Sequence, residues 1–175
     1  MAASRCYFGL LRDLRSKLLS KTTKCKIYKT LIRPILTYGC ESWILKKSDE
    51  NLILVFERKV LRTIFGAVCE GERWRTRYNF KLQRDFNEPN IVAVVKTRLR
   101  WTGHVARMDR SRAPSMLFRN EDPGGQRRAG RPRARWADGV QDDLLTLGVT
   151  NWKTTAQDRS RWNQILEQAK TSKWL

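Results

Sequence analysis

The chain has 175 residues, of which 36 are Lys or Arg and 17 are Asp or Glu, so its formal net charge at pH 7 is +19. Hydrophobic residues make up 41% of the sequence, which argues against disorder throughout and allows one ordinary domain or two small helical lobes. So large a positive excess repels itself in a compact state and indicates a phosphate-rich polyanion as partner, with an anionic membrane surface or a merely soluble basic protein as the alternatives.

The first two predicted helices are amphipathic. Leu10, Leu14 and Leu18 recur at helical spacing and predict a helix over residues 4–19. In the next helix apolar residues share one face and cations share the opposite face, until Pro34 kinks or restarts it. The apolar face holds Ile27, Tyr28, Leu31 and Ile32, and the cationic face holds Lys26, Lys29 and Arg33.

A third helix is predicted from Ser48, an N-terminal cap followed by first-turn acids, to Gly66, which stops it. Its apolar stripe comprises Leu52, Ile53, Phe56, Val60, Leu61 and Ile64. Arg58, Lys59 and Arg62 cluster away from that stripe, so this helix also divides into a packing side and a cationic side.

Residues 69–87 are less periodic and rich in arginine and aromatic residues. We interpret them as a short helix with loops. Trp74 and Tyr78 are expected to be buried there, with stacking on unpaired bases as the alternative role.

Residues 90–108 again predict a helix with a broad apolar stripe. The opposite face carries the series Lys96, Arg100, Gly103 and Arg107, with His104 beside it. This spacing predicts a straight line of positive charge. Arg98 falls within the apolar stripe, where an unpaired charge is costly, so it is expected to snorkel or to pair with a carboxylate.

The C-terminal third begins with residues 119–135, which combine Pro, Gly and Arg and predict an exposed, flexible connector. A short helix from Trp136 closed by Gly148 and a last helix around Trp162 follow, and they are expected to pack as a hairpin. The predicted class is therefore all-α, with a helical bundle over residues 1–68, a basic helical region over 69–118, the connector over 119–135 and a helical hairpin over 136–175.

The sequence offers no complete catalytic or metal site. Two-metal phosphoryl transfer needs paired carboxylates, and the best candidates, Asp138, Asp142 and Asp143, fit first-turn acids and a solvated helix face better. His104 has no triad partners. Four scattered cysteines without a C-x-x-C pair and a single histidine argue against zinc and against a disulfide framework. We expect no cofactor, no metal and no enzymatic activity from this chain alone.

Targeting signals are also missing from the sequence. No apolar run approaches the roughly 20 residues that span a bilayer, and the first residues do not form a signal peptide. We therefore expect an intracellular protein with no membrane partner.

The connector contains AGRPRAR (residues 129–135), which resembles the minor-groove AT-hook, a G-R-P core between basic residues. Ala129 stands where that motif has an arginine, so a flexible clamp that ignores base sequence is favoured over minor-groove readout. The residues expected to contact nucleic acid are Lys96, Arg100, His104, Arg107, Arg58, Arg62, Arg127, Arg128, Arg131, Arg133 and Arg135.

Four phrases carry a resemblance to a known family: KIYKTLIRPILTYGCESW (residues 26–43), FERKVLRTIFG (56–66), RLRWTGHVARM (98–108) and GRPRARWADGVQDDL (130–144). In this order they resemble the region downstream of the polymerase palm in reverse transcriptases of non-LTR, LINE-type retrotransposons. The resemblance implies a thumb-like helical part and a C-terminal extension that handles template RNA and new DNA. The family's Y-x-D-D palm motif, apurinic-type endonuclease and zinc knuckle have no counterpart here.

Charge and resemblance together predict a non-catalytic C-terminal fragment that grips the backbone of template RNA and cDNA, in the nucleus. One alternative is a non-autonomous polymerase subunit that needs a reverse transcriptase palm on another chain. The other alternative is a non-functional retroelement remnant. The sequence does not distinguish RNA, DNA and hybrid as the preferred ligand.

Overall fold

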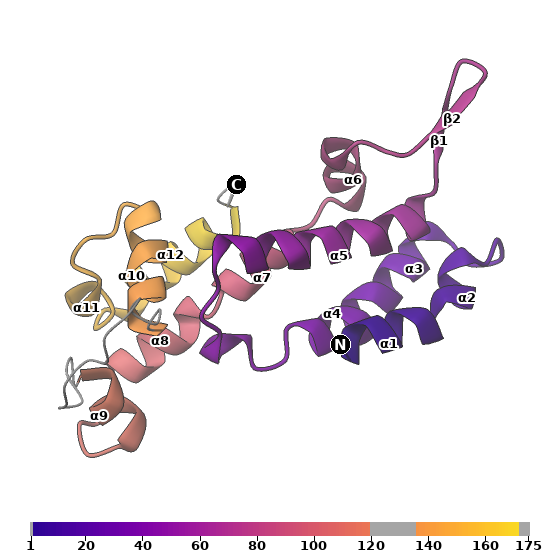
Figure 1. Ribbon diagram of the computed structural model, residues 1–175. Helices are drawn as coiled ribbons and strands as arrows, with labels where there is room; N and C mark the ends of the chain where they lie inside the picture. The colour runs from indigo at the N-terminus through magenta and orange to yellow at the C-terminus, as the bar shows by residue number, and fades with distance from the viewer. Residues whose placement is uncertain (1, 120–135, 172–175) are drawn as a thin grey trace, which may run out of the picture. The chain divides into compact units, whose positions relative to one another are not determined.

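The computed structural model describes residues 2–119 and 136–171. Within these ranges the chain is mostly helical, with one short two-stranded ribbon, which confirms the predicted all-α class (Figure 1). It forms two compact units: unit 1 combines residues 1–38 with 46–92, and unit 2 combines 39–45 with 93–175. The expected segment boundaries at residues 68 and 118 fall inside these units, because the helices that follow each of them pack back onto earlier ones.

Unit 1 begins with α1 (Ala2–Gly9) and α2 (Leu11–Arg15), so the single helix predicted over residues 4–19 is two shorter ones. The chain leaves the helix at Ser16, whose ψ angle of 135° is extended. Leu18 is therefore exposed, while Leu14 is buried in the core. The leucine spacing predicted that this region is helical but did not predict where the helix ends.

The second helical segment contains a π-helical turn. It consists of α3 (Lys21–Ile27), the π-helix η1 (Tyr28–Ile32) and α4 (Arg33–Leu36), with Pro34 in the first turn of α4. The predicted cationic face is wrong at Arg33, which is buried and forms an ion pair of 3.6 Å with Glu57. Glu57 lies on the buried face of the third predicted helix and also accepts hydrogen bonds from the Tyr28 hydroxyl (2.8 Å) and the Ile91 amide (2.9 Å).

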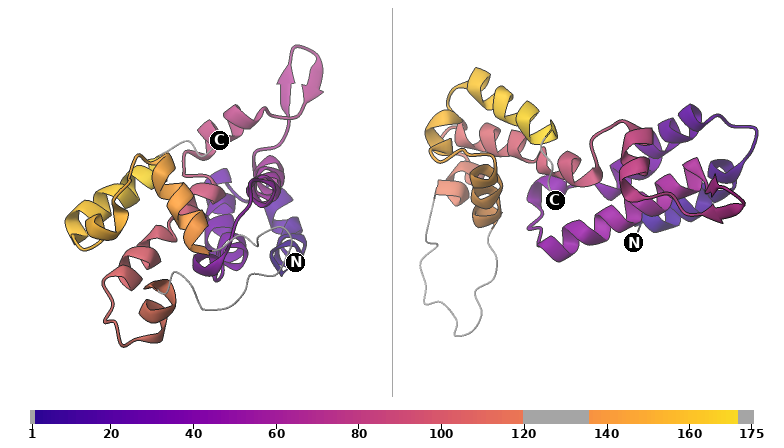
Figure 2. Two further views of the ribbon diagram at one scale, coloured as in Figure 1. Left: turned by 60° about the vertical axis from the view of Figure 1, so that its left-hand side comes forward. Right: turned by 90° about the horizontal axis from the view of Figure 1, so that it is seen from above.

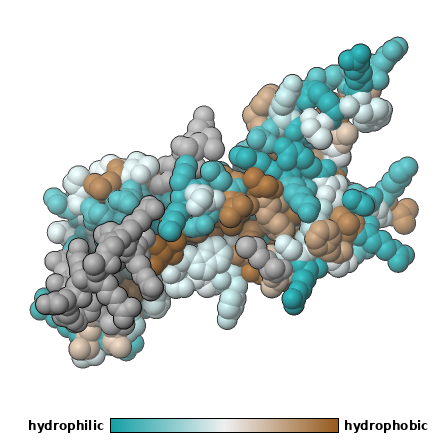
Figure 3. Space-filling view, in the orientation of Figure 1, coloured by the Kyte–Doolittle hydropathy of each residue, from teal (hydrophilic) through white to brown (hydrophobic). Residues whose placement is uncertain are grey.

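Helix α5 (Lys47–Phe65) is the longest element of unit 1 and packs against α2, α3 and α6 (Figure 1). It starts one residue before the predicted cap, because the Asp49 carboxylate accepts a hydrogen bond from the Lys46 amide (3.0 Å). It ends at Gly66, as predicted, where φ is +72°. Figure 3 shows hydrophobic surface along α5, which agrees with the exposure of Leu52 and Val55. The core of unit 1 comprises Tyr7, Leu14, Tyr28, Ile32, Val60, Leu61, Ile64, Leu82 and Phe86.

A β-hairpin follows α5, where the sequence predicted only loops and a short helix. Strands β1 (Val68–Glu70) and β2 (Arg73–Arg75) pair antiparallel and turn at Gly71, whose φ is +65°. The predicted short helix is α6 (Asn79–Phe86). Figure 1 and the left view of Figure 2 show the hairpin extending away from the helices of unit 1.

Unit 2 contains the 3₁₀ turn η2 (Cys40–Ser42), most of α7 (Ile91–Lys96), and α8 (Leu99–Ala106), α9 (Ala113–Arg119), α10 (Trp136–Thr146), α11 (Trp152–Thr155) and α12 (Arg159–Thr171). The single helix predicted over residues 90–108 is wrong. The amides of Thr97 and Arg98 bond to carbonyls three residues back, at 3.1 and 3.0 Å, and this tight turn separates α7 from α8.

The C-terminal helices join unit 2 through α8. The Trp162 indole of α12 donates a hydrogen bond of 2.9 Å to the Leu99 carbonyl and lies directly against Gly103. Helix α12 thus packs on a helix that precedes the connector, which differs from the expected separate hairpin. Helix α10 ends near Gly148, as predicted, and the backbone of Gly148 is left-handed, with φ +77°. No helix in the described part of the chain has both the length and the apolar character that crossing a membrane requires.

Candidate nucleic-acid interface

A buried ionic cluster in unit 2 holds the first residue of the predicted cationic line. The Lys96 ammonium pairs with one oxygen of Asp143, and the Arg98 guanidinium pairs with the other at 2.6 Å. Arg98 also donates to the Trp43 carbonyl at 2.6 Å. All three charged side chains are almost fully buried. We call Lys96, Arg98 and Asp143 the core cluster.

The core cluster settles three expectations from the sequence. Arg98 pairs with a carboxylate, which confirms that expectation and identifies Asp143 as the partner. The placement of Lys96 on an exposed face is wrong, because the turn at Thr97 separates it from α8 and directs it to Asp143. The interpretation of Asp143 as a solvated acid is wrong, because it is buried and pairs with both cations, whereas Asp138 and Asp142 are exposed.

A second group of cations in unit 2 surrounds a small surface pocket. His104, Arg107 and Met108 come from α8 and the residues after it, and Arg159 and Asn163 come from the first turns of α12. We call these five residues the cation pocket. None of its lining residues, all within the described ranges, is a carboxylate.

Arg107 is held in the cation pocket by a hydrogen bond that its guanidinium donates to the Ala156 carbonyl. Burial lowers the pKa of Arg107, and the positive charge of Arg159 lowers it further. Two guanidinium groups that repel each other are stabilised by an anion placed between them. The pocket is therefore suited to a phosphate or a similar anion.

Two further residues extend the surface beside the pocket. Arg100 is exposed. The Trp101 ring lies 5.3 Å from the His104 ring, between centroids, and is partly exposed. Among the residues of the predicted line of positive charge, the structure therefore brings His104 and Arg107 together and leaves Arg100 exposed nearby. Lys96 is buried and does not belong to this surface.

Arg159 was not among the predicted site residues, although its position in the sequence could have indicated a binding role. It occupies the first turn of α12, where the helix dipole favours negative charge and disfavours a cation. A cation in such a position is unfavourable for the helix alone. That mismatch indicates a role outside helix stability.

Unit 1 has its own basic groove, with a volume of about 570 Å³, lined by Tyr7, Arg15, Val55, Lys59, Arg62 and Thr63. The Lys59 ammonium lies 4.9 Å from the Phe8 ring centroid, and Arg62 donates to the Asn79 side chain at 2.7 Å. The predicted site residue Arg62 thus lies beside Lys59, while Arg58 is half-buried and does not line the groove. Arg15 was not predicted, since it comes from a different helix.

The connector arginines Arg127, Arg128, Arg131, Arg133 and Arg135 lie outside the described residues. Their predicted contact with phosphates stays a prediction. In the portion that is described, no three His, Cys, Asp or Glu side chains gather as ligands for a metal ion.

Comparisons with known proteins give one relative. No family model and no solved structure matches the chain. A protein of Caenorhabditis elegans described as uncharacterized and transposon-derived is 24% identical over 172 residues, which cover 94% of this chain. The chain spans 61% of that protein's length. This similarity supports a transposon origin.

Proposed function

We propose that this chain is a nucleic-acid-binding segment of a retrotransposon protein, akin to the C-terminal region of a non-LTR reverse transcriptase, and that it grips the RNA or cDNA backbone without catalysing synthesis. The observation that carries the proposal is the cation pocket, where Arg107, at the C-terminal end of α8, and Arg159, in the first turn of α12, line one pocket and no lining residue is a carboxylate. A chain with a net charge of +19 that keeps cations unpaired at its surface is suited to a polyanion.

The cation pocket would hold a backbone phosphate through directed hydrogen bonds. A guanidinium presents its N–H groups in a planar fork that matches two phosphate oxygens. Arg107 is already fixed by its bond to Ala156, so less conformational freedom is lost on binding. Exposed Arg100, one helical turn before His104, would take a neighbouring phosphate. Contacts of this kind position the chain on nucleic acid and do not read base sequence.

The core cluster argues against a polymerase site in this segment. Two-metal catalysis needs carboxylates that are free to hold cations about 4 Å apart. Asp143 already accepts both Lys96 and Arg98, so it does not form a metal-binding pair with its neighbour Asp142. Polymerisation would require a palm on another chain or in another part of a longer protein. The transposon-derived relative and the four family-like phrases support this assignment to a retroelement, and a nuclear location goes with it.

The test is a titration of the purified chain with labelled duplex DNA, RNA–DNA hybrid and single-stranded RNA, repeated from 50 to 200 mM salt. If six or more phosphates are contacted, the affinity should fall by a factor of about a thousand or more over this range. Different base sequences of one length should bind alike. A shallow salt dependence with strong sequence discrimination contradicts the proposal, and failure to bind at 50 mM salt identifies a non-functional remnant.

A further inference from the structure

The hairpin and the segment after it expose three large aromatic side chains. Trp74, Tyr78 and Phe80 are 74%, 55% and 65% exposed. The expectation that Trp74 and Tyr78 are buried is therefore wrong. Leaving large apolar rings in water costs free energy compared with burying them, and three within seven residues is more than the isolated exposed residues that soluble proteins ordinarily show.

Two of these rings are held parallel. The centroids of Tyr78 and Phe80 lie 5.8 Å apart, and their planes differ by 13°. The Arg75 guanidinium lies 4.0 Å from the centroid of the Tyr78 ring. Since side chains alternate along a strand, Trp74 points to the opposite face of the hairpin from Arg75. Arg75, Tyr78 and Phe80 therefore form one group of stacked flat side chains, which we call the aromatic platform.

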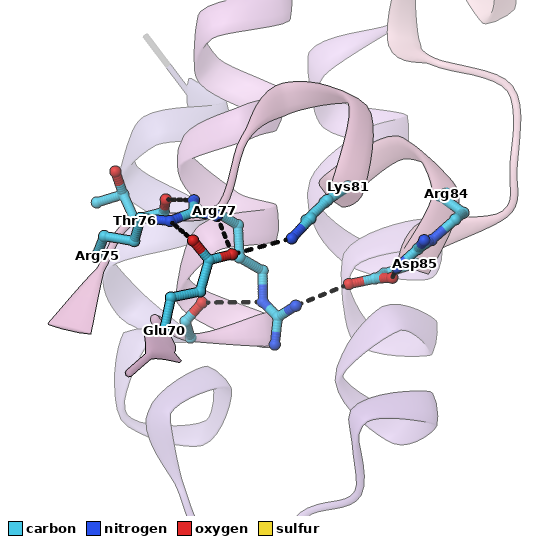
Figure 4. A network of polar contacts seen from close by, with 8 residues as sticks. Glu70, Arg75, Thr76, Arg77, Lys81, Arg84 and Asp85 are labelled. Carbon is cyan, nitrogen blue, oxygen red and sulfur yellow. Dashed lines mark hydrogen bonds and ion pairs between the residues drawn. The ribbon is translucent and has the colours of Figure 1, made fainter. Parts of the chain in front are cut away.

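Ionic contacts fix the arginine of this platform (Figure 4). Glu70 accepts a hydrogen bond of 2.7 Å from Arg75 and one of 3.1 Å from Lys81. Together these bonds lower the pKa of Glu70 to about 2, and the bond from Arg75 has the larger effect. The carboxylate therefore stays ionised at neutral pH. Arg75 is thus held over Tyr78 before any ligand arrives.

A second ion pair anchors the chain between the hairpin and α6. Arg77 bonds to the Gly66 carbonyl at 3.2 Å and to the Asp85 carboxylate at 3.0 Å (Figure 4). Arg77 thereby connects the end of α5, which precedes Tyr78 in sequence, with α6, which follows it. The platform is therefore preorganised by contacts on both of its flanks.

We infer that the aromatic platform stacks on unpaired bases of single-stranded nucleic acid. A parallel, exposed pair of rings with a guanidinium over one of them matches the flat, polarisable face of a nucleobase. Bases inside a duplex are covered by their neighbours, so only an unpaired strand offers such a face. This inference rests on the proposed function and adds to it a preference for bases over bare backbone.

The cations beside the platform suit the phosphates of such a strand. Arg84 has a side chain that is 73% exposed and contacts Asp85 only at 3.4 Å. Arg73, on the same face of the hairpin as Arg75, is also exposed. A protein partner would instead need a continuous apolar surface, whereas residues 68–86 alternate aromatic rings with five cations.

The experiment compares two ligands that have the same length and charge. The full chain is titrated at 150 mM salt, and again at 50 mM salt, with a single-stranded 12-mer and with an abasic 12-mer that keeps the sugar–phosphate backbone. One stacked base should raise the affinity for the normal strand at least about fivefold over the abasic strand. The double variant Tyr78→Ala/Phe80→Ala should lose this preference and bind the abasic strand as the wild type does.

Two further variants make the result specific. Phe80→Leu keeps apolar surface but removes the flat ring, so it should weaken the preference for bases. Trp74→Ala removes an exposed ring from the opposite face of the hairpin, so it should retain the preference. Because all these side chains are exposed, the thermal unfolding midpoint should stay at the wild-type value in each variant.

The outcomes separate the two proposals. If the wild type binds both 12-mers equally and with steep salt dependence, the proposed function stands and the platform is overturned. Loss of the preference in Trp74→Ala, or its retention in the double variant, also overturns the platform. If neither strand binds at 50 mM salt, both proposals fail.

Discussion

The core cluster and the cation pocket, both in unit 2, put cations of the same sequence region to opposite uses. Lys96 and Arg98 share Asp143 and are buried, whereas Arg107 and Arg159 have no carboxylate between them and face a surface pocket. Lys96 and Arg107 nevertheless fall on one face of a regular helix in the sequence pattern. The comparison teaches that the presence of a matched carboxylate, and not helical spacing, separates structural cations from those available to a ligand.

The largest effect is expected from removing the shared carboxylate. Asp143→Ala leaves two buried cations without a counter-charge and should destabilise the fold by about 3–5 kcal/mol. Asp142→Ala is the matched control, because this neighbouring aspartate is exposed, and it should change stability by less than about 0.5 kcal/mol. Urea denaturation followed by circular dichroism measures both. Equal effects of the two variants would show that the core cluster does not stabilise unit 2.

A smaller effect is expected at Gly103, which the sequence placed on the cationic line and the structure buries against α12. A Cβ atom there would lie 2.1 Å from the Trp162 indole nitrogen, so Gly103→Ala should cost about 1–3 kcal/mol by overpacking. It should also weaken phosphate binding, because α12 carries Arg159. Gly9→Ala in α1, where nothing lies within 4 Å of the added atom, is the control for unit 1 and should not destabilise it. Thermal unfolding of both variants checks this, and a wild-type midpoint for Gly103→Ala would contradict the packing of α12 on α8.

The smallest effect is expected at Arg161, an exposed cation on α12 that pairs with Asp158 at 3.6 Å. Exposed pairs contribute little, so Arg161→Gln should change the free energy of unfolding by at most about 1 kcal/mol. Its charge is already matched, and it does not line the cation pocket. Filter binding should therefore give nearly wild-type affinity for duplex DNA. A loss as large as that of a pocket variant would mean that charge alone, and not position, governs binding.

Much of the fold follows from local sequence signals. The apolar period and the acids after Ser48 predicted α5, and Gly66 and Gly148 predicted two helix ends, because left-handed backbone favours glycine. The hairpin was missed because strands of three residues are too short to show an alternating pattern. The break between α7 and α8 was missed because the apolar residues on either side of it, Val95 and Leu99, keep helical spacing.

The candidate site was less predictable, because it depends on contacts between distant residues. The sequence showed that Arg98 needs a carboxylate, but Asp143 lies 45 residues away and only the fold brings it there. A similarly wide separation in sequence hides the role of Arg159 beside Arg107. The exposure of Tyr78 depends on the direction of a hairpin that no local pattern predicts.

The most direct test of the central claim is the slope of log affinity against log salt for duplex DNA in a pocket variant. If Arg107 and Arg159 contact phosphates, Arg107→Gln/Arg159→Gln should reduce the slope by about two, roughly one for each lost contact. Arg161→Gln, which removes a charge from the same helix, should keep the wild-type slope. An unchanged slope in the double variant, with the protein still folded, would contradict the account and leave the basic groove of unit 1 and the connector arginines as the places to search.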